Sequence, residues 1–208
     1  MTSKRMDPRV KRTREMLWNA LISLLREKEY SKISVQEIAE RATLNRTTFY
    51  LHFYSKDDLL EQSFEEIMNE LKKMVSMTYE EFDYRIDQPH PVLVRLFEQI
   101  ALHSAFYRTI LTEKNMQHLI DRMKDIMTQF MKEGLERMKA DKVEFAVSVD
   151  ITVPYFASAY LGVIFWWLEQ DMPYTPTYMA RQVTQMSSRG PFVGDPFKGK
   201  AIQESTGL

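Results

Sequence analysis

Cysteine is absent from the 208-residue sequence, which excludes disulfides, thiolate zinc sites and cysteine nucleophiles. Histidine is scarce, and none of the four histidines lies in an H-E-x-x-H motif. Neither a glycine-rich phosphate loop nor a G-x-S-x-G motif occurs. Because the usual catalytic motifs are missing, we expect that the protein is not an enzyme and that it binds no metal or cofactor.

An excess of charge of one sign is also absent, because the formal net charge is −1, but the charges are unevenly distributed. Residues 1–60 contain 12 Lys and Arg against 8 Asp and Glu, whereas residues 61–208 contain 16 against 21. Most of the basic excess lies in the first fourteen residues. A basic head followed by an acidic body indicates contact with a polyanion, although a solvated N-terminus would have the same composition.

Long hydrophobic runs are rare, and the longest uncharged one covers the 18 residues 151–168. This length is borderline for crossing a bilayer. Its flanks carry Asp150, Glu169 and Asp171 instead of the Lys or Arg that anchor membrane helices, and Pro154 interrupts it. No apolar segment of the secretory kind follows the basic N-terminus. We therefore expect a fully buried helix, no membrane contact and a cytoplasmic location.

Helical periodicity runs along nearly the whole chain, and no strand-length alternation appears. The predicted fold class is therefore all-α. Ser34 and Glu37 have the spacing of a capping box, while Asn45 and Ser55 are further N-cap candidates. Residues 81–90 are the clearest loop. The expected helices cover residues 8–28, 34–42, 45–53, 55 onwards, 92–103, 106–111, 115–138, 143–170 and 177–186.

Residues 34–60 read SVQEIAERATLNRTTFYLHFYSKDDLL. They resemble the DNA-binding domain of TetR/AcrR family transcription regulators, whose characteristic residues recur here at the family's spacing: Ile38-Ala39, Thr48-Phe49-Tyr50, His52-Phe53, Ser55-Lys56 and Leu59-Leu60. Residues 153–176 resemble the penultimate helix and following turn of one TetR subgroup. The resemblance implies a three-helix helix-turn-helix DNA-binding domain at 1–55, a helical effector-binding and dimerisation domain at 56–186, and a flexible tail at 187–208.

The turn of this helix-turn-helix departs from the family pattern. Many members have glycine where this chain has Thr43, and glycine or another small residue where it has Thr47. A β-branched residue disfavours positive φ, so we expect a turn that avoids left-handed geometry. The exposed start of the recognition helix, residues 45–47, leaves the preferred DNA sequence open.

The outward face of the recognition helix holds the candidate DNA-binding residues. Phe49 and Phe53 are four residues apart and should pack inward together. Arg46 can bind guanine by two hydrogen bonds, a threonine methyl group can contact thymine, and polar side chains nearby can bind phosphates. For each residue the alternative is a solvated surface group. The family pattern adds Gln36, on the preceding helix, as a further residue that contacts bases. The predicted DNA-binding residues are therefore Gln36, Arg46, Thr47, Thr48, Tyr50, His52 and Lys56.

Two further sites are expected in the C-terminal domain. Recognition helices usually work in symmetric pairs, and small and aromatic residues of the uncharged run suit close helix packing in a homodimer. The predicted interface residues are Ala157, Ala159, Gly162, Phe165, Trp166, Tyr178 and Met179. Aromatic and methionine side chains also suit an apolar effector pocket. For the interface residues and for the pocket residues, the alternative is that they pack within the protein's own hydrophobic core. The predicted pocket residues are Phe97, Ile100, His103, Phe106, Tyr107, Met123, Met127, Phe130, Tyr155 and Tyr160.

The predicted function is that of a transcriptional regulator, a repressor that binds a palindromic operator in double-stranded DNA as a homodimer. A small hydrophobic effector would release it. The alternative is a DNA-binding adaptor or co-activator whose C-terminal domain binds a partner protein instead of a small molecule.

Overall fold

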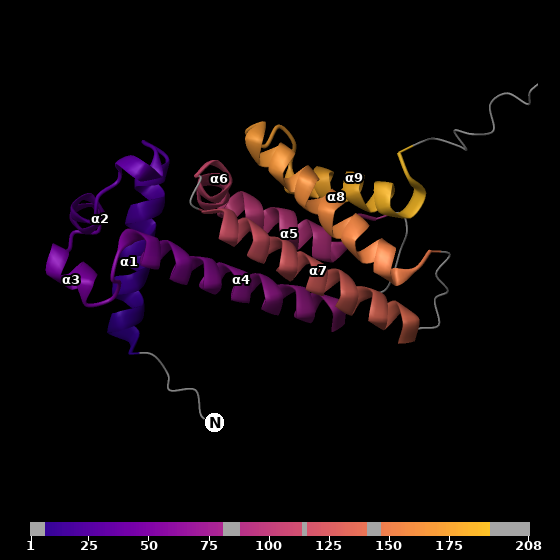
Figure 1. Cartoon of the computed structure of the whole chain (residues 1–208), viewed down its shortest axis with the longest axis horizontal. Coiled ribbons are helices and arrows are strands. Elements are labelled where there is room, and N and C mark those ends of the chain that lie inside the picture. The colour runs from indigo at the N-terminus through magenta and orange to yellow at the C-terminus, as the bar shows by residue number, and fades with distance from the viewer. Residues whose placement is uncertain (1–6, 81–87, 114–115, 141–146, 192–208) are drawn as a thin grey trace, which may run out of the picture.

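The computed structural model describes residues 7–80, 88–113, 116–140 and 147–191. These residues form helices and turns without any strand, which confirms the predicted all-α fold class. Figure 1 shows an elongated arrangement with a small bundle at one end and a larger one beside it. The elements are α1 Pro8–Leu25, the 3₁₀ helix η1 Tyr30–Lys32, α2 Val35–Arg41, α3 Arg46–Tyr50, α4 Lys56–Glu80, α5 Pro91–Leu102, α6 Ser104–Thr112, α7 Gln117–Ala140, α8 Val149–Glu169 and α9 Pro176–Arg189.

The small bundle consists of α1, α2 and α3, and each helix starts at a side-chain cap. The Asp7 carboxylate accepts a hydrogen bond from the Arg9 N–H at 2.8 Å. The predicted capping box of α2 is present, because Ser34 Oγ accepts from the Glu37 N–H while Glu37 accepts from the Ser34 N–H. Asn45 caps α3 as predicted. Fully buried side chains from all three helices form the core of this bundle, among them Leu17, Leu21, Ile38 and Phe49.

The turn between α2 and α3 corrects the expectation for Thr43, whose φ is +59°. The Leu44 N–H donates to the Ala39 carbonyl at 2.8 Å, and the Thr43 N–H donates to the Glu40 carbonyl at 2.9 Å. This pair of bonds is a Schellman motif, which places its C′ residue in the left-handed region. The helix end therefore imposes on a threonine the conformation that glycine adopts most easily.

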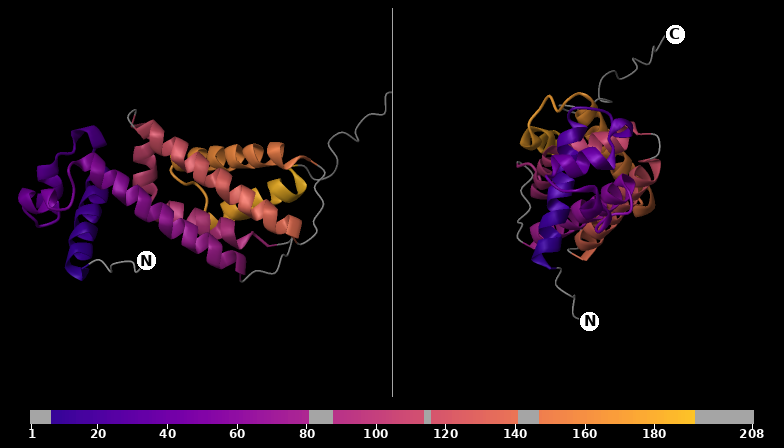
Figure 2. Two further views of the ribbon diagram at one scale, coloured as in Figure 1. Left: turned by 60° about the horizontal axis from the view of Figure 1, so that its bottom comes forward. Right: turned by 90° about the vertical axis from the view of Figure 1, so that its left-hand side faces the viewer.

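Helix α4 joins the small bundle to the larger one. Ser55 Oγ caps it by accepting from the Asp58 N–H at 3.1 Å, as predicted. Figures 1 and 2 show α4 leaving the small bundle and running along α5 and α7. In the larger bundle α5 packs against α9, and α7 packs against α8. The arrangement thus connects the predicted DNA-binding helices to the predicted effector-binding helices through one long helix.

Aromatic contacts also join the two bundles at α6. Phe106 is fully buried, and its ring meets that of Trp18 on α1 edge to face, with 5.2 Å between the centroids. Phe64 on α4 lies on another side of Phe106, at 6.3 Å. An ion pair between Arg14 and Glu66 at 3.0 Å ties α1 to α4 nearby. A movement of α6 would therefore be transmitted by direct side-chain contact to both α1 and α4.

Helix α8 corrects the expectation of a fully buried helix. By length and hydropathy it is the one helix in the described ranges that is suited to cross a membrane. One face, including Leu161 and Trp167, is buried against the other helices. The opposite face is open, with Tyr155 66% exposed and Trp166 44% exposed. Because the run is apolar all round, its sequence alone does not distinguish the two faces.

Several predicted boundaries differ from the observed ones. Helix α1 ends at Leu25 instead of residue 28, and α9 continues to Arg189, past the predicted end at 186. Residues 187–189 of the expected tail are therefore helical, whereas residues 192–208 lie outside the described residues. Most of the expected 81–90 loop also lies outside them, because only residues 88–90 are described. These differences of a few residues do not alter the order of the helices.

Candidate nucleic-acid interface and central cavity

Helix α3 is held by its inward face and by its N-cap. Phe49 and Phe53 are 0% and 2% exposed and pack as a pair, as predicted. At the helix start the Asn45 carbonyl oxygen Oδ1 accepts from both the Thr48 N–H and the Thr48 hydroxyl, at 2.7 and 2.9 Å. The Thr48 side chain is therefore half-buried and takes part in the cap. These contacts fix which face of this five-residue helix points outward.

The outward face carries most of the predicted DNA-binding side chains. Arg46, Thr47 and Tyr50 are exposed on α3, and Gln36 is exposed on α2. The Arg46 guanidinium lies over the Tyr50 ring and donates to its hydroxyl oxygen at 3.2 Å. Gln36 donates to the Glu40 carboxylate at 2.5 Å. Both contacts are made between exposed side chains of the small bundle.

His52 and Lys56 are less accessible. His52 is half-buried beside Phe53. Lys56 Nζ donates to the carbonyl oxygens of Tyr30 at 2.8 Å and Ile33 at 2.9 Å, and it lies 4.4 Å from the Tyr30 ring centre. The ammonium group therefore already has acceptors within the protein, and the predicted phosphate contact stays a prediction. Lys56 thereby fastens the η1 segment to the start of α4.

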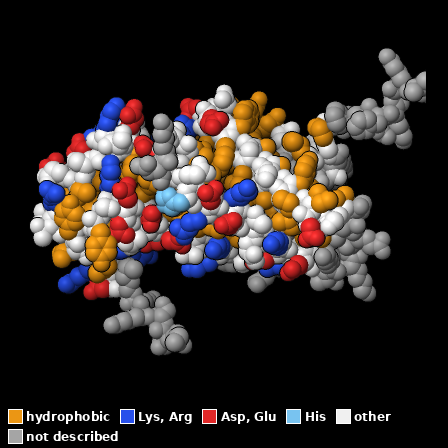
Figure 3. Space-filling model, viewed as in Figure 1, with side chains coloured by type: hydrophobic (Ala, Val, Ile, Leu, Met, Phe, Trp, Pro, Cys, Tyr) orange, Lys and Arg blue, Asp and Glu red, His pale blue; other side chains and the backbone are white. Residues whose placement is uncertain are grey.

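Two exposed residues beside α3 were not among the predicted set. Leu51 is 77% exposed and Tyr54 is 91% exposed, while the Tyr54 N–H donates to the Asp58 carboxylate at 2.8 Å. Figure 3 shows hydrophobic side chains at the surface of this end of the molecule. The sequence contained a signal for Leu51, because this apolar residue falls outside the buried spacing of Phe49 and Phe53.

The basic N-terminal head is only partly described. Lys4 and Arg5 lie outside the described residues. Arg9, Lys11 and Arg12 are exposed on the first turns of α1. Arg14 instead pairs with Glu66 and stacks on the Phe53 ring at 4.6 Å, so it braces the small bundle.

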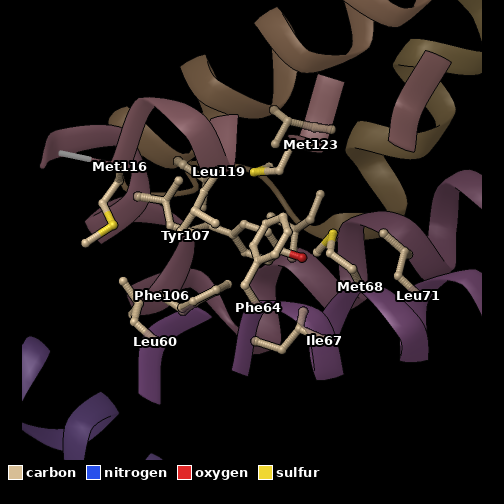
Figure 4. Close-up of a cluster of buried hydrophobic side chains, with 14 of the residues drawn as sticks. Leu60, Phe64, Ile67, Met68, Leu71, Phe106, Tyr107, Met116, Leu119 and Met123 are labelled. Carbon is tan, nitrogen blue, oxygen red and sulfur yellow. The ribbon is translucent and has the colours of Figure 1, made fainter. Parts of the chain in front are cut away.

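A small void of about 20 Å³ lies in the larger bundle, between α4, α5, α6, α7 and α8. Five predicted pocket residues line it: Ile100, Tyr107, Met123, Met127 and Phe130. Figure 4 shows Tyr107 of α6 and Met123 of α7 beside buried side chains of α4. A volume near 20 Å³ holds about one water molecule and is far below that of a ligand pocket. The remaining lining residues are Met68, Leu71, Leu96, Ile126, Leu161 and Ile164.

The other predicted pocket residues lie elsewhere. Phe97 packs edge to face on Trp167 at 5.2 Å, and Phe106 packs on Trp18. The Tyr160 hydroxyl is 2.9 Å from Ser187 Oγ. Tyr155 is exposed on α8, and His103 is half-buried, where burial lowers the pKa of its imidazole. Helical periodicity could not separate these positions from the lining residues, because it indicates which positions are apolar and not which of them meet a cavity.

The open face of α8 is joined to α9 through aromatic contacts, because the Trp166 ring lies 6.4 Å from that of Tyr174, which stacks on Tyr178 at 4.8 Å. Its α8 members recur at spacings of four, four, three and four, which is one helical face: Ile151, Tyr155, Ala159, Gly162 and Trp166. A side-chain carbon added at Gly162 would meet no atom within 4 Å. On α9, Tyr178 and Met186 are 43% and 53% exposed. We refer to these seven residues as the α8–α9 face, and Figure 3 shows hydrophobic side chains exposed over these helices.

The predicted interface residues divide between this face and the interior. Ala159, Gly162, Trp166 and Tyr178 are exposed. Ala157 and Met179 are 1% and 4% exposed within the protein's own core, and Phe165 is half-buried against it. Ala157 and Met179 are therefore unavailable to a second chain in this conformation, because they already pack within their own bundle.

Two family sequence models match the chain. One is described as bacterial regulatory proteins of the tetR family and matches residues 17–62, and the other is described as a transcriptional regulator C-terminal region and matches residues 87–189. The chain is 23% identical over 183 residues to YxbF, an HTH-type transcriptional regulator of Bacillus subtilis (strain 168). The match covers 88% of this chain and 46% of YxbF, so the chain spans about half the length of this curated relative.

Solved structures with the same fold include a TetR-family transcriptional regulator from Syntrophomonas wolfei, with a TM-score of 0.69 and 18% identity over 89% of this chain and 99% of that one. The transcriptional regulator FadR from Bacillus subtilis, solved in complex with stearoyl-CoA, has a TM-score of 0.56 and 14% identity over 86% of this chain and 99% of that one. At these identities the likeness concerns the fold.

Proposed function

Because the chain belongs to the TetR family of bacterial transcription regulators, which are DNA-binding proteins and not enzymes, we propose that it represses transcription by binding a palindromic operator as a homodimer. In this proposal the DNA-binding domain covers residues 1–55, the helical effector-binding and dimerisation domain covers 56–186, and the protein acts in the cytoplasm. The observation that carries the proposal is the outward polar face of α3, held rigid by buried Phe49 and Phe53.

DNA recognition is assigned to this outward face. Arg46 has a guanidinium that can leave Tyr50 and bind guanine O6 and N7 in the major groove. The Thr47 methyl group and the exposed Leu51 supply apolar contacts for thymine methyl groups. Gln36 reaches the same groove from α2, while Tyr50, Tyr54 and His52 contact phosphates. Thr48 and Lys56 are assigned chiefly to positioning, because their polar atoms already hold the cap and the η1 carbonyls.

Dimer formation is assigned to the α8–α9 face. A set of exposed apolar side chains on one helix face is uncommon on a monomer and suits an interface between copies of the chain. The exposed alanine and glycine allow the helix backbones to approach closely, and Trp166 with Tyr178 supplies large contact area. Pairing through this face would set the spacing of the two α3 helices on successive major grooves.

Release from DNA is assigned to a small apolar effector in the larger bundle. The void is too small for such a ligand, so binding requires that α4 or α7 move apart from the others. Such a ligand acts by preferring the conformation in which the two α3 helices are wrongly spaced. The methionine-rich lining can repack around it, and the complex of FadR with stearoyl-CoA supports an apolar ligand.

The decisive experiment selects bound sequences from random double-stranded DNA and measures the mass of the complex at fixed salt. We expect a palindromic motif bound by two chains. Arg46→Ala should weaken binding by about 1 to 3 kcal/mol and relax the preference at one base pair of each half-site. Lys132→Ala, which removes an exposed cation from α7, is the matched control and should leave binding unchanged. A folded dimer that selects no motif would refute operator binding and favour the adaptor function.

A further inference from the structure

The void in the larger bundle adjoins a polar pair inside an otherwise apolar core. Tyr107 lines the void, and its hydroxyl donates to Gln99 Oε1 at 2.8 Å. Gln99 is 8% exposed, so its amide is shielded from water. It lies three residues after Leu96 and directly before Ile100, which both line the void. Gln99 is not itself among the lining residues, and its amide lies one hydrogen bond away from the Tyr107 side chain in the wall of the void.

The Gln99 amide has an unused donor. Its Nε2 has no hydrogen-bond partner among the residues that the structure describes. Leaving a buried polar group unpaired is costly, and such groups in native proteins usually have an ordered water or a ligand as partner. A molecule that occupies an enlarged void would therefore have to supply a hydrogen-bond acceptor to this amide.

The surroundings restrict the charge of that acceptor. Tyr107 is the only polar residue among those that line the void, and no charged side chain lines it. Burial raises the pKa of the Tyr107 hydroxyl, although its hydrogen bond to Gln99 acts in the opposite direction. The same environment disfavours a carboxylate or phosphate, because a buried charge without a counter-charge is very costly. A neutral oxygen avoids this cost and can accept from the amide.

On these grounds we propose that the void expands to bind an apolar molecule with one neutral hydrogen-bond acceptor, a ketone or ester oxygen, which accepts from Gln99 Nε2. This inference rests on the proposed effector site and adds the chemical class of the ligand. The apolar part of the ligand occupies the space vacated by Met68, Met123 and Met127, whose flexible side chains can change rotamer.

The test compares three probes of equal chain length: 2-heptanone, heptane and heptanoate. Binding is followed by NMR of ¹³C-methyl methionine, because Met68, Met123 and Met127 line the void while Met186 is exposed on α9 and serves as the internal control. We expect the lining methyl signals to shift with 2-heptanone at a Kd about three- to tenfold lower than with either other probe, since one neutral hydrogen bond is worth a net factor in this range.

A double variant, Gln99→Met with Tyr107→Phe, separates recognition from packing. It removes both polar partners while keeping side chains of similar size, a change that is close to neutral for stability. The variant should bind heptane as the unmodified protein does, whereas the preference for 2-heptanone should fall to less than about twofold. Its α8–α9 face and α3 are unchanged, so operator binding without any probe should also be unchanged.

Three results would overturn the proposal. Equal affinity for 2-heptanone and heptane would mean that a buried water holds the amide. A ketone preference that survives in the double variant would place the acceptor elsewhere. If no probe shifts the lining methyl signals, the void does not open to such molecules. Operator selection by the ligand-free protein is measured in parallel, so that failure of the proposed regulator function is distinguished from failure of this inference.

Discussion

Lys56 provides the sharpest test of how the small bundle is held together, because its ammonium group has carbonyl partners in the structure, whereas the sequence predicts a phosphate contact. In Lys56→Met the apolar stem is kept and only the ammonium group is lost. Two short hydrogen bonds disappear, to the carbonyls of Tyr30 and Ile33. A bond from a charged donor contributes about 1.5 to 3 kcal/mol when buried. Both sites are only partly buried, so solvent screening reduces this to about 1 kcal/mol each and about 2 kcal/mol in total.

Two measurements are needed, namely urea unfolding and the salt dependence of DNA binding. We expect Lys56→Met to lower the free energy of unfolding by about 2 kcal/mol and to leave the slope of log K against log salt unchanged. Lys32→Met is the matched control, because Lys32 is exposed on η1 and pairs only with exposed Glu29 there, so it should change stability by less than about 0.5 kcal/mol. If stability were unchanged and the slope of log K against log salt fell in magnitude by about 1.8, the reasoning would be refuted. That change corresponds to the loss of two phosphate contacts, one from each chain of a dimer.

Three further predictions follow from single residues. Thr43→Gly should raise the free energy of unfolding by about 0.5 to 1 kcal/mol in urea titrations, because glycine adopts a φ of +59° without steric cost, and a decrease would contradict this. Trp166→Glu should shift the mass measured by sedimentation from dimer to monomer, whereas Tyr54→Glu, at a more exposed aromatic position outside the α8–α9 face, should not. The hydrogen bond from Lys28, with those from Ser34, lowers the pKa of Glu37 to about 2. Its stabilising effect is therefore complete above the unfolded pKa of about 4.3 and is lost as the pH falls towards 2, so Glu37→Gln should reduce the pH dependence of unfolding in that window and leave it unchanged above pH 6.

Local signals in the sequence predicted the helix order and the caps observed at Ser34, Asn45 and Ser55. A cap can be predicted in this way because it depends on residues only two or three positions apart. The four-residue spacing of Phe49 and Phe53 likewise predicted the inward face of α3. Boundaries were less accurate, as at Leu25 and Arg189, since the last turn of a helix depends on what it packs against.

The effector site shows where local signals were insufficient. Phe97, Phe106 and Tyr107 are all buried and all lie on the apolar faces of α5 and α6, yet only Tyr107 lines the void. Whether a buried side chain meets a cavity or another side chain depends on which helix lies opposite. The sequence pattern has no information on that neighbour, so it gave a set of apolar residues instead of a site.

The sequence by itself determined the all-α class, the helix-turn-helix and the family, because these depend on periodicity, caps and a short motif that are local in the chain. Tertiary structure alone decided the partners of Lys56, the left-handed conformation of Thr43 and the division of α8 into a buried and an open face. Ala157 and Ala159 are equivalent in sequence terms, but packing buries the first and exposes the second. The physical reason is that an uncharged helix has no polar stripe to define its orientation, so the surrounding helices select the face that is buried.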